Sequence, residues 1–164
     1  RAGACAAADA DNNNYNIAVV TAGTYNTEFE AYAKIITIVP ADMQHTVYIK
    51  GSFVEGWKIT DENGELIDDY KLEETSDGVF EITMTITDEM VNGATWQAGL
   101  QLDTTTGSDG TFIGAGALGE DAADNANALF RPETGGNLTS TTAGTYRFVY
   151  DLNTGELNIY EVTA

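Results

Sequence analysis

The fold is decided by residues 144–161, GTYRFVYDLNTGELNIYE. Two runs with apolar residues at every second position flank the turn at residues 152–155, LNTG. A period of two on both sides of a glycine-containing turn is typical of an antiparallel β-hairpin that buries one face. This period places Tyr146, Phe148 and Tyr150 on one face of the first strand, and Leu157, Ile159 and Glu161 on one face of the second. The sequence therefore predicts a hydrophobic core against this hairpin.

Similar alternating runs occur upstream at short spacing. The predicted strands cover residues 46–53, 78–86 and 94–102. The dipeptide Asn63-Gly64 predicts a hairpin turn between strands. One helical turn is predicted over residues 87–92, and residues 103–137, rich in Gly, Asp, Asn and Ala, are predicted to be loops, including the glycine pattern at 114–119. Short strands with almost no helical periodicity predict an all-β fold, an antiparallel β-sandwich in which Trp96 is a core residue.

The amino-terminal part of the chain has a different character. Residues 1–14, RAGACAAADADNNN, are small and polar and predict a flexible tail. From Tyr15 the sequence becomes strand-like, and an alternating pattern through Glu28 and Thr37 continues to Val39, before Pro40 ends it. We therefore expect two parts. Residues 1–39 form a tail with a candidate linking strand, and residues 40–164 form the sandwich.

The charge of the chain excludes several classes of partner. The 164 residues include 7 Lys and Arg against 26 Asp and Glu, a formal charge of −19. Such a field repels nucleic acids and anionic lipid surfaces and favours cations or neutral partners such as glycans. No apolar run approaches the length of about 18 residues that a membrane span needs. The sequence therefore predicts no nucleic-acid partner and no membrane span.

Few residues have the chemistry that catalysis or disulfide formation requires. Cys5 is the single cysteine, so no internal disulfide is expected, and His45 is the single histidine, in no recognisable triad pattern. We therefore expect a protein that is not an enzyme. Residues 1–5, RAGAC, resemble the end of an export signal, with a lipobox-like cysteine as the alternative interpretation. Either interpretation predicts an extracellular or cell-surface location.

From Thr46 onward the chain resembles the carbohydrate-binding sandwiches of SusE/SusF-type starch-binding surface proteins and, more distantly, glycogen-binding modules of the early-set immunoglobulin type. Three stretches carry the resemblance: residues 47–57, VYIKGSFVEGW, residues 77–83, DGVFEIT, and residues 144–155. The resemblance implies an immunoglobulin-like sandwich, here with an N-terminal extension strand, and contact with glycans. Family sites pair exposed aromatics with a basic or amide side chain, and Trp57 with Lys58 is the nearest match.

Several smaller signals suggest ligands or modifications. Aromatic rings stack on the apolar faces of sugars, so Trp57 and Tyr70 are candidate glycan contacts, although a core position for Trp57 is the alternative. Calcium is the metal that the sequence suggests, since it prefers clustered carboxylate and amide oxygens. The candidate ligands are Asp121, Asp124 and Asn125, with solvated turns as the alternative interpretation. Candidate glycosylation sites that would make this a glycoprotein are Asn137, in the sequon NLT, and Thr104, in the triplet DTT.

Two functions fit these observations. An N-terminal strand that adds to a neighbouring subunit's sheet would make the chain a self-assembling structural protein, because head-to-tail addition does not close and produces a fibre. The candidate assembly-strand residues are Ile17, Val19, Val20, Ile35, Ile36 and Ile38. The sequence thus predicts a homopolymeric subunit of an extracellular filament. The alternative is a cell-surface carbohydrate-binding module that recognises starch or another glycan.

Overall fold

The computed structural model describes residues 44–134 and 136–162 in full, together with the backbone of four strands nearer the amino terminus. The chain divides into two compact units, Arg1–Gln44 and His45–Ala164. The boundary lies five residues later than the division predicted between residues 39 and 40.

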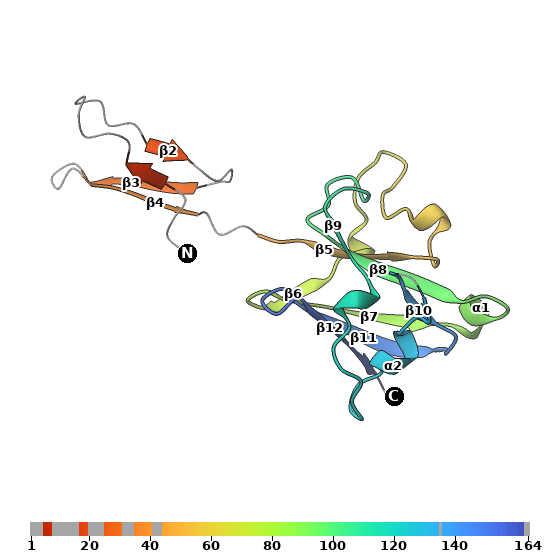
Figure 1. Cartoon of the computed structure of the whole chain (residues 1–164). Coiled ribbons are helices and arrows are strands. Elements are labelled where there is room, and N and C mark those ends of the chain that lie inside the picture. Colours follow the sequence, from red (N-terminus) through yellow and green to blue (C-terminus); the bar gives the residue numbers. More distant parts are fainter. Residues whose placement is uncertain are drawn as a thin grey trace. The chain divides into compact units, whose positions relative to one another are not determined.

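The larger unit is an all-β sandwich of two antiparallel sheets, which Figure 1 shows as two layers. The first sheet contains β5 (Val47–Gly51), β8 (Trp96–Leu102), β9 (Thr111–Ile113) and β10 (Leu138–Ser140). The second sheet contains β6 (Glu73–Ser76), β7 (Val79–Ile86), β11 (Gly144–Asp151) and β12 (Glu156–Glu161). The described residues form only short helices: η1 (Glu55–Trp57), η2 (Asp68–Tyr70), α1 (Asp88–Val91), η3 (Ala115–Ala117) and α2 (Asn127–Phe130). The predicted all-β sandwich is confirmed.

The two sheets differ in how their strands are ordered. The second sheet has the order β12-β11-β7-β6, so the predicted carboxyl-terminal hairpin continues directly into β7. In the first sheet β8 is the central strand. It pairs with β5 along one edge and shares its other edge between β10, next to Trp96–Ala98, and β9, next to Leu100–Leu102. The divided edge leaves β9 and β10 with three residues each.

Aromatic rings from both sheets fill the centre of the sandwich. Trp96 is buried and stacks on Phe53, with ring centroids 5.9 Å apart. Phe130 of α2 packs edge-on against Tyr146 of β11 at 4.9 Å. The hairpin buries one alternating face, except that Glu161 at the end of β12 is exposed; its buried residues are Tyr146, Phe148, Tyr150, Leu157 and Ile159. The core position of Trp96 and the buried face of the hairpin are therefore confirmed.

The smaller unit consists of two separate ladders. Strand β1 (Cys5–Ala7) pairs with β2 (Ile17–Val19), and β3 (Tyr25–Glu30) pairs with β4 (Ile35–Pro40), both antiparallel. Two predictions need correction here. Cys5–Ala7 is a strand within the predicted tail, whose other residues lie outside the described part. The alternation through residues 28–37 belongs to two antiparallel strands, because Glu30 pairs with Ile35 and the chain reverses between them.

No helix among the residues that the structure describes is long and apolar enough to cross a membrane.

Candidate functional site

The predicted assembly residues fall on two strands of the smaller unit. Ile17 and Val19 belong to β2, and Ile35, Ile36 and Ile38 belong to β4, whereas Val20 lies outside the described residues. Strand β4 pairs with β3 over all six of its residues. In both ladders each strand has one paired edge and, among the described residues, no partner on its other edge. A two-stranded ladder of this kind is marginally stable in water without further strands or a packed face.

The edges of the sandwich are protected, and the edge at β12 is the best protected of them. The segment that follows η3 runs beside β12 and bonds to its backbone. The Gly119 amide donates to the Leu157 carbonyl at 3.0 Å, and the Ala126 amide donates to the Ile159 carbonyl at 2.7 Å. A strand edge whose backbone groups are already paired offers little to an incoming strand.

A buried asparagine completes the cover on β12. Asn127 is fully buried, and its Oδ1 accepts a hydrogen bond from the Ile159 amide at 2.8 Å. Its Nδ2 donates to the Asn158 Oδ1 at 2.8 Å and reaches the carbonyls of Gly119 and Glu120 at 3.3 Å. One side chain thus supplies what a neighbouring strand would otherwise supply. No periodic pattern in the sequence predicts this role of Asn127.

The other three edges are covered in part, short or acidic. The backbone of residues 71–72 pairs with β5, where the Leu72 amide donates to the Val47 carbonyl at 2.8 Å. Strands β9 and β10 contain only three residues each. Strand β6 is exposed, begins with Glu73 and Glu74, and has a register shift before Ser76. Short strands, irregular pairing and charge are the devices by which sheets avoid edge-to-edge association.

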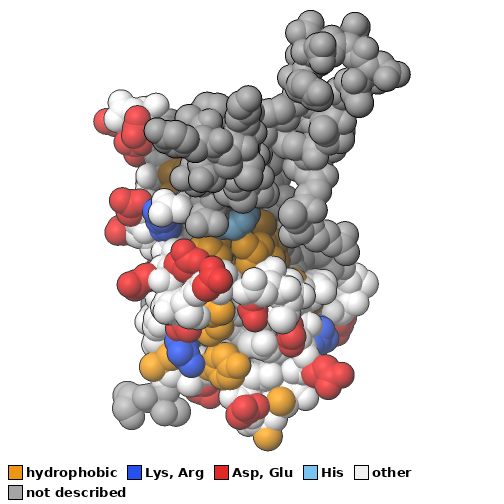
Figure 2. Space-filling model, turned by 90° about the vertical axis from the view of Figure 1, so that its left-hand side faces the viewer, with side chains coloured by type: hydrophobic (Ala, Val, Ile, Leu, Met, Phe, Trp, Pro, Cys, Tyr) orange, Lys and Arg blue, Asp and Glu red, His pale blue; other side chains and the backbone are white. Residues whose placement is uncertain are grey.

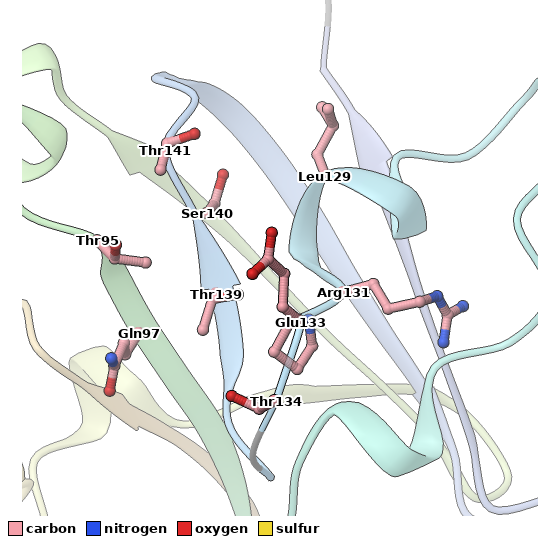
Figure 3. A pocket seen from close by; sticks show the side chains of 10 residues that line it. Thr95, Gln97, Leu129, Arg131, Glu133, Thr134, Thr139, Ser140 and Thr141 are labelled. Carbon is pink, nitrogen blue, oxygen red and sulfur yellow. The ribbon is translucent and has the colours of Figure 1, made fainter.

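A polar groove of about 480 Å³ lies beside β10. Figure 3 shows Thr139 and Ser140 on β10 and Thr141 directly after it, with Glu133 and Thr134 on the segment after α2. The Glu133 carboxylate points over β10. The Arg131 side chain points away from Glu133. Its Nη2 donates a hydrogen bond to the Asp121 Oδ1 at 2.9 Å. The remaining lining residues are Thr95, Gln97, Leu129 and Pro132. Hydroxyl, amide and carboxylate groups dominate this groove.

The outer face of the first sheet continues this polar surface. Gln97 pairs with Thr139 across the strands, and its Oε1 accepts a hydrogen bond from the Asn137 Nδ2 at 3.2 Å. Two residues further along β8, the ring of Phe112 lies against the backbone of Gly99, where any larger side chain would collide with it. Phe112 remains 42% exposed. Amide groups beside an exposed aromatic ring can bind a sugar. The amides form hydrogen bonds with the sugar hydroxyls, and the aromatic ring stacks on the apolar face of the sugar.

The three predicted glycan residues lie in different surroundings. Trp57 is half-buried and does not belong to the core cluster of the described residues, so the core alternative is wrong. It has a φ of 58°, directly after Gly56 at 65°, and a bulky residue in this region of backbone space is strained. Lys58 is exposed, whereas the ring of Tyr70 packs against Phe53 at 5.7 Å. Trp57 and Lys58 thus remain accessible candidates, and Tyr70 is partly used in packing.

The predicted calcium ligands have other partners. Asp121 is paired with Arg131, and the Asn125 Oδ1 accepts hydrogen bonds from the amides of Ala122 and Asn127, both at 3.2 Å. Asp124 is exposed. Within residues 44–134 and 136–162, no group of three or more His, Cys, Asp or Glu side chains is arranged to hold a metal ion. Calcium binding at these residues stays a prediction.

The two predicted glycosylation sites differ in access. Asn137 is half-buried at the start of β10, and its amide is bonded to Gln97. Thr104 is 3% exposed, and its hydroxyl donates to the Asp109 Oδ1 at 2.6 Å. The Gly107 amide donates to the same hydroxyl at 2.8 Å. A hydroxyl that is buried and bonded on both sides does not favour attachment of a glycan to the folded chain.

Asp109 organises the loop that contains Thr104. Its carboxylate also accepts hydrogen bonds from the hydroxyls and amides of Thr105 and Thr106, at 2.6 to 2.9 Å. The hydroxyls of Thr104 and Thr105 are the main cause that holds the Asp109 pKa far below its usual range, because they stabilise the charged form. The loop is fixed to the first sheet, where the Gln101 Nε2 donates to the Asp109 carbonyl at 2.6 Å.

The single histidine makes a local contact. His45 Nδ1 lies 2.7 Å from Asp103 Oδ2, and the other oxygen of Asp103 accepts a hydrogen bond from the Thr46 amide at 3.0 Å. No serine or cysteine among the described residues is hydrogen-bonded to this pair. The glycine pattern at 114–119 contains η3 and enters no strand-to-helix phosphate loop, in agreement with its interpretation as a loop.

Comparison with known proteins gives no relative for this chain. No family model, no curated protein and no solved structure matches it.

Proposed function

We propose that this chain is a non-catalytic structural protein, a subunit that assembles with copies of itself into an extracellular filament through the strands of residues 1–44. The observation that supports this most strongly is the construction of the smaller unit. It consists of two-stranded ladders, and in the part of the chain that is described no further strand completes them. Such ladders gain stability from additional strands, and another copy of the chain can supply these.

The sandwich does not need a partner of this kind. Its residues form a core of both sheets and leave few backbone groups for pairing at the edges. The chain thus combines one unit that is complete alone with one that gains hydrogen bonds by association. A heterologous contact between such units produces an open fibre when its rotation does not close into a ring.

The charge distribution agrees with this division of roles. Residues 1–44 contain 2 basic and 5 acidic residues, a formal charge of −3, which leaves −16 of the total −19 for residues 45–164. On the face shown in Figure 2, acidic side chains are scattered widely and basic ones are few. Sandwiches of this charge repel one another and stay soluble. Association through the less charged unit is the arrangement with the smaller electrostatic cost.

Deletion of residues 1–44 tests the proposed function. Sedimentation velocity and negative-stain microscopy of the full chain are expected to show filaments. The deletion variant is expected to be a monomer with the circular dichroism of a folded β-protein. A full chain that stays monomeric at all accessible concentrations would contradict the proposal. Filaments that persist without residues 1–44 would contradict it equally.

A second candidate function, the binding of neutral glycans, is favoured by the groove beside β10. Its lining of Gln97, Glu133 and threonine hydroxyls offers donors and acceptors, and Phe112 on the same sheet face offers a ring. The strained, half-buried Trp57 is a separate candidate contact. Strain at a bulky residue is often kept where it serves a function. Glycan binding and assembly are compatible, since they use different units.

A pull-down on insoluble starch separates the two candidate glycan sites. If Gln97→Ala is no longer retained on starch, binding is assigned to the groove. If Trp57→Ala is no longer retained, binding is assigned to the loop of η1. Met90→Ala is the control, because Met90 is also an exposed apolar residue but neither lines the groove nor belongs to η1. If the unaltered protein is not retained on starch or on a panel of other neutral polysaccharides, the glycan function is excluded.

A further inference from the structure

We infer that the strands of residues 1–44 pair with the same strands of other copies, and not with a sandwich edge, so that a shared intermolecular β-sheet forms the spine of the filament. This inference rests on the proposed function and names the surface that the assembling strands bind. The occupant of the β4 edge that has no partner among the described residues is therefore β3 or β4 of a second copy of this chain.

The first argument is the state of the sandwich edges. Strand β12 is covered by residues 118–127 and by the Asn127 side chain, and β5 is paired in part with residues 71–72. The open edge of β6 is acidic and irregular. Within the described residues, no sandwich edge thus offers a regular stretch that matches the six residues of β4. A β3 or β4 strand in another copy offers that length.

The second argument is the composition of β4. Its sequence, IITIVP, places Ile35 and Val39 on one face of the ladder and Ile36 and Ile38 on the other. Apolar residues on both faces are typical of a strand that is covered on both sides. The edge of β6 would place such a strand beside Glu73 and Glu74, where a carboxylate would lose hydration. A neighbouring β4 would place apolar residues beside apolar residues.

The third argument is charge. Pairing the smaller units brings together surfaces of formal charge −3, whereas docking on a sandwich brings a surface of −3 against one of −16. Like charges in proximity oppose association, although salt screens them over about 8 Å at physiological ionic strength. The pairing of smaller units therefore has the lower repulsion.

The dimensions permit a continuous spine. Each added β3-β4 ladder lengthens a sheet by about 10 Å, while a 120-residue sandwich is about 35 Å across. Sheet twist of about 20–25° per strand rotates successive copies by roughly 45°, which moves neighbouring sandwiches apart around the spine. The six residues between Pro40 and Val47 span up to about 20 Å when extended. Sandwiches at that distance have room to fan outward.

Mixing the full chain with a fluorescently labelled sandwich of residues 45–164 tests the inference. All residues of the core cluster in the described part of the chain lie within this fragment, so we expect it to fold without the smaller unit. We expect the labelled sandwich to stay in the supernatant when filaments of the full chain are pelleted, at every molar ratio, and to leave the growth rate unchanged. Labelled sandwich in the pellet, or capping of growth by a small fraction of it, would overturn the inference.

A second variant makes the result independent of the label. Lysine substitution of both acids in β6, Glu73→Lys with Glu74→Lys, changes the charge of the exposed β6 edge of the sandwich. Filament formation by this variant is expected to match that of the unaltered chain. A large change in the critical concentration would place the contact at β6 and overturn the inference. A full chain that never polymerises fails the proposed function itself, which distinguishes the two failures.

Discussion

Strands β4 and β12 are both six residues long and both lie at the edge of an antiparallel ladder. The outer edge of β12 is closed by amides of the segment 118–127 and by the Asn127 side chain. For β4, no residue in the described part of the chain does the same. Backbone N–H and C=O groups need hydrogen-bond partners wherever water is excluded. The β12 edge finds these partners within the chain, and we propose that the β4 edge finds them by association with another copy.

Proline in β4 should produce the largest effect, a complete loss of assembly. Neighbouring residues of a strand point their amides to opposite edges, so Ile36→Pro and Thr37→Pro remove one donor from the ladder and one from the open edge. Neither variant should change the melting temperature of the sandwich. Thr37→Ala, which keeps the amide, is the control and should still assemble. Sedimentation measures the loss, and a proline variant that forms normal filaments would remove β4 from the contact.

A core substitution should affect the other unit alone. Phe148 is fully buried between the sheets, and its ring lies 5.5 Å from that of Phe130. Phe148→Ala should lower the free energy of unfolding of residues 45–164 by about 3–5 kcal/mol, because it removes apolar contacts and leaves a cavity. Urea unfolding followed by tryptophan fluorescence measures this. A loss below about 1 kcal/mol would show that the ring does not hold the sheets together.

Opening the protected edge should make the sandwich behave more like the smaller unit. Asn127→Ala leaves the buried Ile159 amide without its acceptor and the Asn158 Oδ1 without its donor, which should cost about 1–3 kcal/mol of stability. The exposed edge of β12 should also cause the isolated sandwich to form dimers or aggregates. Asn63→Ala, in an exposed turn, is the control. Light scattering of residues 45–164 tests the second effect, and an Asn127→Ala sandwich that stays strictly monomeric would count against edge protection.

The smallest effect concerns the loop that Asp109 holds. The pKa of the Asp109 carboxyl is lowered in the folded state by its hydrogen bonds. The stability that these bonds add is therefore fully present above the pKa of the unfolded chain, about 3.9, and is lost as the pH falls below it. The melting temperature of the unaltered sandwich should exceed that of Asp109→Asn by a few degrees between about pH 5 and pH 8, and the difference should shrink below about pH 4. A difference that grows toward acid pH would contradict the assigned cause.

Local pattern predicted the parts of the fold that depend on neighbours in sequence. The hairpin of residues 144–161 and the burial of Trp96 followed from alternation within a few residues of each. The smaller unit was less predictable, because an unbroken alternation from Glu28 to Thr37 does not mark the reversal between β3 and β4. A period of two continues across a turn when the turn has no glycine or proline signal.

The groove and the edge protection could not be predicted for a related reason. The groove joins residues near positions 95–97, 129–134 and 139–141, which only the folded sheets bring together. Phe130 and Asn127 lie in a segment rich in small and polar residues, and two buried side chains in a short helix have no periodicity to detect. Among the predicted site residues, Trp57 and Lys58 are accessible, whereas the roles of the six assembly residues remain predictions.

Hydrogen–deuterium exchange at several protein concentrations tests the central claim most directly. If the smaller unit completes its sheet with other copies, amides of residues 25–30 and 35–40 should exchange fast in dilute protein and become protected as filaments form. Amides of β7 and β11 should be equally protected at every concentration. Protection of residues 25–40 that does not depend on concentration, or new protection along β6 on assembly, would contradict the account.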